Sequence, residues 1–159
     1  MLKKLSIGMC FTAAAAVCAI ISLIVYAVNV NGEGYFQNAT VSNLVLYCVL
    51  AALALIAAIA LNLFVEVPEG PAQLGVNLVT GALQIVAPML LAMCLINLIV
   101  GRAEGLGFIY FSNADVILEV QTPANMASAS GAIANMVVLG ISTVVGIVAS
   151  FINVKKKSA

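Results

Sequence analysis

Four long runs of apolar residues follow one another along the chain, separated by shorter stretches rich in polar residues, glycine or proline. The runs cover residues 5–28, 43–65, 72–100 and 126–154. Each exceeds the ~20 residues that an α-helix needs to cross a hydrocarbon core of ~30 Å. The pattern therefore predicts an all-α integral membrane protein, in which four spans pack as an antiparallel transmembrane bundle.

Three connections join the predicted spans. Loops 29–42 and 101–125 lie on one side of the membrane, and the short turn 66–71 lies on the other. The turn contains two prolines and a glycine, which cannot continue a helix, whereas Pro71 and the pair Thr122-Pro123 are suited to begin one. We therefore expect a tight inner turn and two longer outer loops.

The outer loops carry patterns of their own. Residues 108–111 and 116–120 are rich in aromatic and β-branched side chains and are separated by Ser112-Asn113-Ala114-Asp115, which is typical of a short hairpin. Residues 35–41 are suited to a third strand. The sequence thus predicts a small extracytoplasmic β cap made from both loops.

The two outer loops also share a motif. Sliding residues 22–40 onto 97–115 without a gap gives eight identities in nineteen pairs. The pairs include Tyr35/Tyr110, Phe36/Phe111 and Asn38/Asn113. Outside this window the match fades, and chance similarity between apolar segments is the alternative explanation. The echo predicts a tandem 2+2 repeat, with both halves related by an axis along the membrane normal.

Composition agrees with the membrane assignment. Hydrophobic residues make up 64% of the 159 residues and charged residues 8%, whereas soluble domains contain about 25% charged residues. The four spans leave no length for a separate soluble domain of the usual size. We expect residues 1–159 to form a single membrane domain in contact with the lipid bilayer.

Charge predicts orientation. Five lysines, Lys3, Lys4 and 155–157, lie outside the first and last spans, while the loops opposite hold only Arg102. The excess of basic residues is found on the cytoplasmic side of most membrane proteins. We therefore predict cytoplasmic N- and C-termini, and we expect a bacterial cytoplasmic membrane.

The sequence offers little catalytic chemistry. It contains no histidine, and its four cysteines (Cys10, Cys18, Cys48 and Cys94) all lie inside apolar runs, where cysteine usually acts as a small hydrophobe. No metal-ligand cluster or nucleophile arrangement is recognisable. We predict no enzyme, no metal, no cofactor and no nucleic-acid binding. The middle of every span lacks ionisable residues, which argues against proton-coupled transport.

Two spans carry stripes of polar or small residues. Asn77, Thr80 and Gln84 share one face of the third span and could line a polar path, although hydrogen bonding between helices is the simpler interpretation. In the fourth span, Ser142, Gly146 and Ser150 are spaced as a small-xxx-small seam, which favours helix packing, within one chain or between two copies.

The shared loop motif is the remaining candidate site. It comprises Tyr35, Phe36, Asn38, Tyr110, Phe111 and Asn113. Aromatic residues at a membrane surface can form an interfacial belt, and asparagine favours turns. Alternatively, the exposed aromatic residues anchor a partner, as they do in many interfaces.

These features lead to two hypotheses on function. The first is a non-enzymatic membrane scaffold or accessory subunit, which binds another membrane protein or a second copy of itself through helix faces and the outer cap. The alternative is a small channel or carrier for a neutral solute, lined by Asn77, Thr80 and Gln84.

Overall fold

The computed structural model describes residues 6–65 and 70–152, which form five helices. They are α1 (Ile7–Asn31), α2 (Leu44–Phe64), α3 (Pro71–Phe111), α4 (Ala114–Val120) and α5 (Pro123–Phe151). All except α4 are long and apolar enough to cross a membrane. The prediction of a four-span helical membrane protein is confirmed.

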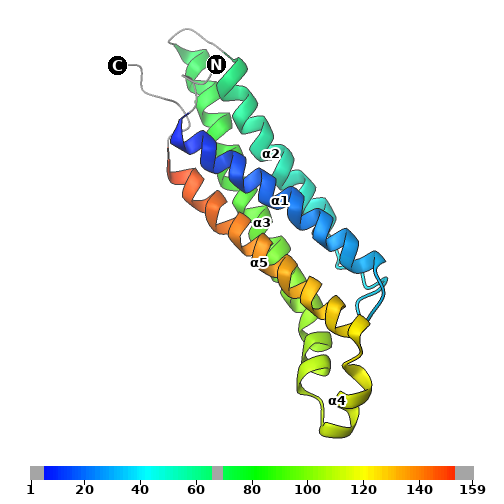
Figure 1. Ribbon diagram of the computed structural model, residues 1–159. Helices are drawn as coiled ribbons and strands as arrows, with labels where there is room; N and C mark the ends of the chain where they lie inside the picture. The colour runs from blue at the N-terminus through cyan, green and yellow to red at the C-terminus, as the bar shows by residue number, and fades with distance from the viewer. Residues whose placement is uncertain (1–5, 66–69, 153–159) are drawn as a thin grey trace.

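The four long helices are arranged as a ring. Helix α1 packs against α2 and α5, and α3 packs against the same two neighbours from the opposite side (Figure 1). The segment between α1 and α2 and the segment containing α4 lie at one end of the bundle, which we call the loop side (Figure 1). The spans therefore alternate in direction, as an antiparallel bundle requires.

Local sequence explains where the helices begin and end. Helix α1 ends at Asn31, immediately before Gly32, and α3 begins at Pro71, as predicted. Thr122 caps α5, because its side-chain oxygen accepts a hydrogen bond from the Asn125 amide at 3.2 Å. The predicted turn 66–71 is described only at its last two residues, and the five terminal lysines lie outside the described residues.

Small side chains fill much of the interior. Alanines on α1, α2, α3 and α5 are almost completely buried, and they allow neighbouring helix backbones to approach closely. They include Ala15, Ala19, Ala51, Ala58, Ala87 and Ala132. Buried hydrogen bonds add to this packing, since Ser22 on α1 donates to the side-chain oxygen of Asn135 on α5 at 2.6 Å. Bulky aliphatic side chains face outward, as expected in contact with lipid.

Helix α3 is much longer than the predicted span 72–100. It has 41 residues, or a length of ~60 Å, twice the thickness of the hydrocarbon core. Its extension keeps one buried face, formed by Leu98, Arg102, Gly105 and Ile109 at helical spacing. Because this face includes an arginine and a glycine, hydrophobicity alone did not reveal it.

The predicted β cap is wrong. No strand occurs in residues 6–65 and 70–152. Residues 108–111 form the last turn of α3, residues 116–120 lie in α4, and residues 35–41 form turns and irregular chain. The side-chain oxygen of Asn113 accepts a hydrogen bond from the Val116 amide at 3.0 Å, so the supposed hairpin turn is the N-cap of a helix.

The structure does not support the tandem repeat. Tyr35 and Phe36 follow the end of α1 in a turn, whereas Tyr110 and Phe111 are still part of α3. The two copies of the motif therefore have different backbone conformations.

Candidate functional site

Arg102 is the most unusual buried residue on the loop side. Its side chain is only 2% exposed, and its guanidinium donates a hydrogen bond to the Ala39 carbonyl at 2.6 Å. The guanidinium carbon also lies 4.5 Å from the centre of the Phe36 ring, in a cation–π arrangement. Among the described residues no carboxylate pairs with it. Arg102 thus fastens the α1–α2 loop, residues 32–43, to α3.

Aromatic packing strengthens this attachment. The rings of Tyr35 and Phe36 meet edge to face with centres 5.3 Å apart, and Tyr35 also lies 5.9 Å from the ring of Phe108 on α3. Gly105 leaves the space for both loop rings, because a Cβ there would come within 2.6 Å of each. Phe36 is completely buried, whereas Tyr35 keeps 41% of its surface exposed.

Helix α5 holds the same loop from the other side. The Ser128 hydroxyl accepts a hydrogen bond from the Phe36 amide at 3.1 Å, and the Ser128 carbonyl accepts one from the Asn29 side chain at 2.7 Å. Gly34 has a φ of +120° and lies against Ala124 of α5, so a larger residue would be strained there. On α1, the Tyr26 hydroxyl accepts a hydrogen bond from the Val41 amide at 2.6 Å. The α1–α2 loop is therefore attached to three helices.

The second outer segment extends beyond the bundle. We call residues 103–122, which comprise the end of α3, the link to α4, and α4 itself, the tip hairpin (Figure 1). Gln121 donates a side-chain hydrogen bond to the Ile109 carbonyl at 3.1 Å, and Asn125 donates one to the Val120 carbonyl at 2.8 Å. Together with the Asn113 cap and the packing of Ile109 against Ala129 and Ala132 of α5, these bonds give the tip hairpin a defined shape.

The surface of the tip hairpin is both apolar and acidic. Phe111 is 87% exposed and Leu118 is 84% exposed, so the rest of the chain covers neither side chain. The hairpin also carries three exposed acidic residues, Glu104, Asp115 and Glu119, and no lysine or arginine. Such a surface can bind an apolar patch bordered by basic residues.

The six residues of the predicted outer site fall into different environments. Phe36 is buried, Tyr110 is half-buried, and Asn113 acts as the α4 cap. Tyr35, Asn38 and Phe111 are exposed. The structure places Tyr35 against both Phe36 and Phe108, so the aromatic cluster differs from the one that the repeat implied. Sequence reasoning missed Arg102, Gly105 and Leu118, although the first two share the helical spacing of Leu98 and Ile109.

The predicted polar path lies partly inside the bundle. Asn77 is exposed, whereas Thr80 and Gln84 are buried, and the Thr80 hydroxyl donates to the Val76 carbonyl at 2.9 Å within the same helix. The Gln84 side-chain nitrogen is buried without a hydrogen-bond partner. Pro88, four residues later, has no N–H to donate to the Gln84 carbonyl. Gln84 therefore has a side-chain N–H group without a hydrogen-bond partner and a backbone carbonyl without its usual helical donor.

Two of the three predicted seam residues pack between helices. Ser142 donates a hydrogen bond to the Ala15 carbonyl on α1 at 2.8 Å. Gly146 lies against Pro88 of α3, where an added Cβ would be 3.3 Å from the proline Cβ. Ser150 is half-buried and bonds to the Ile147 carbonyl of its own helix at 2.7 Å. The seam residues Ser142 and Gly146 therefore pack α5 against α1 and α3 of the same chain.

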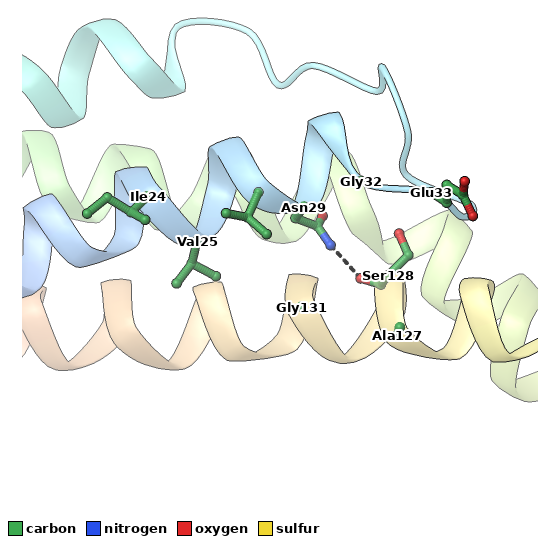
Figure 2. Close-up of a pocket in the computed structure, with 9 residues that line it drawn as sticks. Ile24, Val25, Asn29, Gly32, Glu33, Ala127, Ser128 and Gly131 are labelled. Carbon is green, nitrogen blue, oxygen red and sulfur yellow. Dashed lines mark hydrogen bonds between the residues drawn. The ribbon is translucent and has the colours of Figure 1, made fainter.

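Two cavities open near the loop side. One has a volume of about 310 Å³ and lies between α1 and α5, where Asn29 reaches toward Ser128 (Figure 2). We call it the α1/α5 groove. The other, of about 370 Å³, lies between the end of the α1–α2 loop and α3 and is lined by residues that include Asn43 and Asn97. Neither cavity is lined by Asn77, Thr80 or Gln84.

These features define the class of the protein as a four-span helical membrane protein whose third long helix continues into the tip hairpin. Within the described residues no group of three histidine, cysteine, aspartate or glutamate side chains could hold a metal ion. Comparison with protein-family models, curated proteins and solved structures finds no match.

Proposed function

We propose that the protein is a non-enzymatic membrane scaffold or accessory subunit, which binds another membrane protein through the tip hairpin. The observation that carries this proposal is the exposure of Phe111 and Leu118 on a hairpin with a defined shape. Apolar side chains that are already held in place lose little conformational freedom on binding, and large apolar anchors supply much of the affinity of interfaces.

The charges of the hairpin narrow the chemistry of the partner. Asp115 and Glu119 are exposed on the same short helix as Leu118, and no basic residue accompanies them in residues 103–122. The complementary surface would present apolar side chains surrounded by lysine or arginine. We place this interface on the extracytoplasmic side of a bacterial cytoplasmic membrane, with both termini in the cytoplasm, because the terminal lysines favour that orientation.

Site-specific photocrosslinking tests this proposal. A photoreactive amino acid replaces Leu118 in native membranes, and Val137, which is 56% exposed on α5, serves as the control position. We expect a single stoichiometric adduct from position 118 that disappears when Phe111→Ser is added. A crosslink between two copies of the chain would identify the partner as the protein itself. If position 118 yields no discrete adduct, the proposal is wrong.

The alternative function, a channel or carrier for a small neutral solute, is favoured by one observation. The buried amide of Gln84 lacks a partner, and Pro88 leaves the carbonyl of the same residue without its usual donor. A polar solute that passes Gln84 could use both groups. Gln84→Leu should then abolish flux into liposomes, whereas Asn77→Leu, at an exposed position, should preserve much of it. Equal flux through wild type and Gln84→Leu would contradict a path at this residue.

A further inference from the structure

The α1/α5 groove exists because the residues on its two walls differ in size. Helix α1 contributes Ile24 and Val28, which are 58% and 68% exposed, and α5 contributes the small residues Ala127 and Gly131. Because the residues on the α5 wall are small, a groove is left beside the bulky side chains of the α1 wall (Figure 2). Because this apolar wall is exposed on α1, which is long and apolar enough to cross a membrane, the groove would be open to lipid in a bilayer.

The polarity of the groove changes along its length. Ile24 and Val28 line its deeper part, Asn29 and Ser128 follow at the next level, and Glu33 lies at the end nearest the loop side (Figure 2). Helix α1 rises ~10 Å from Ile24 to its end at Asn31, and Glu33 follows in the α1–α2 loop, so the groove covers much of one half of the ~30 Å hydrocarbon core. The order from apolar to hydrogen-bonding to anionic runs over the depth of one leaflet.

We propose that this groove binds a single phospholipid with an ammonium headgroup, such as phosphatidylethanolamine. One of its two acyl chains would lie along Ile24 and Val28, its ester region beside Asn29 and Ser128, and its ammonium group near the Glu33 carboxylate. The lining residues include one carboxylate and no basic side chain, which favours a zwitterionic lipid over an anionic one.

A second copy of the chain is a less suitable occupant. A two-fold symmetric contact through this groove would bring two Glu33 carboxylates into one interface, and like charges at close range repel. A lipid ammonium group instead places the opposite charge there. The lipid site does not depend on the partner-binding function of the tip hairpin, so each proposal can fail without the other.

Native mass spectrometry of the purified protein with defined lipids tests the site. The wild type should retain one phosphatidylethanolamine with about five-fold preference over phosphatidylglycerol, the effect expected for one charge near a membrane surface. Glu33→Gln should remove this preference while chain binding persists. Ala127→Leu should fill the groove and abolish retention, and the matched control Ala103→Leu, at an exposed position on α3, should retain the lipid.

Two results would overturn the proposal. One is undiminished lipid retention by Ala127→Leu, measured on protein whose helix content and thermal unfolding match those of the control. The other is a change in oligomeric state caused by Ala127→Leu without any change in lipid retention, which would assign the groove to a second copy of the chain.

Discussion

The α1–α2 loop and the tip hairpin both cover the loop side, but different interactions maintain their shapes. The α1–α2 loop is held by long-range contacts, since Arg102, Ser128 and Tyr26 bind its backbone from three helices. The tip hairpin is held by bonds between residues close in sequence, such as Asn113 with Val116 and Gln121 with Ile109. One segment therefore completes the bundle, whereas the other combines local hydrogen bonds with packing of Ile109 against α5 and keeps Phe111 and Leu118 exposed.

This difference suggests distinct roles for the two segments. Phe36 of the α1–α2 loop contributes to the packing of the fold, because the Arg102 guanidinium and the α3 surface cover it. Phe111 and Leu118 of the tip hairpin have no such cover. Of the two copies of the sequence motif, the one in the α1–α2 loop contributes Phe36 to the fold, whereas the one at the end of α3 leaves Phe111 exposed. Four substitutions test the distinction, from the largest expected effect to the smallest.

Arg102→Ala should have the largest effect on stability. It removes a charge-assisted hydrogen bond to the Ala39 carbonyl and leaves a cavity, and we expect a loss of about 3 kcal/mol in the free energy of unfolding. Chemical denaturation in detergent measures the loss, and hydrogen exchange should show faster exchange in residues 32–43. Arg102→Met refills the volume without a donor and should recover only part of the stability. Full recovery by methionine would mean that the guanidinium contributes volume alone.

Gly105→Ala should have the next largest effect. Its Cβ would press against the rings of Tyr35 and Phe36, and overpacking of this kind costs about 1–3 kcal/mol. Gly107→Ala is the matched control on the same helix, because nothing lies within 4 Å of its added Cβ. The control should raise stability by about 0.5–1 kcal/mol, since alanine favours a helix more than glycine does. Thermal unfolding of the two variants compares them directly. Similar stabilities would show that the loop rings do not rest closely on α3.

Asn113→Ala should produce a smaller and strictly local change. Loss of this N-cap costs about 1 kcal/mol and should increase hydrogen exchange in α4. Exchange in residues 32–43 should stay unchanged, because none of the bonds that hold the α1–α2 loop involves α4. Faster exchange in both segments would mean that the tip hairpin and the loop unfold as one unit, contrary to the proposed distinction.

Leu118→Ser should affect folding least. The side chain is 84% exposed, and surface substitutions usually change the free energy of unfolding by no more than about 0.5 kcal/mol. The same substitution should weaken partner crosslinking from a photoreactive residue at position 111. A clear loss of stability in the purified protein would indicate that Leu118 serves the fold rather than binding.

The sequence was sufficient for features that depend on local patterns. Four apolar runs predicted four spans, and Pro71 and Thr122-Pro123 marked two helix starts correctly. The region after Val100 was misread because its buried helical face contains Arg102 and Gly105, which a hydrophobicity pattern treats as loop residues. Aromatic and β-branched residues then made 108–111 and 116–120 resemble strands. Their helical state depends on the Asn113 cap and on packing of Ile109 against α5.

The candidate site was less accessible to sequence reasoning for the same reason. Tyr35, Phe36, Tyr110 and Phe111 were recognised as a group, but their exposure differs because Phe36 lies under a cation that is 66 residues away in sequence. A pairing of this kind becomes visible only when α3 is known to continue to Phe111. The exposure of Leu118 likewise depends on the direction in which α4 leaves α3.

The unbroken length of α3 has a mechanical consequence. Phe111 lies 23 residues beyond Pro88 on the same helix, which gives a lever arm of ~35 Å. A change of ~10° in direction at the proline, where the backbone lacks one hydrogen bond, would swing Phe111 sideways by ~6 Å. A ligand that satisfied the free amide of Gln84 would act at the fulcrum of this lever. Binding at Gln84 and the position of Phe111 would then be coupled through the segment of α3 from Pro88 to Phe111.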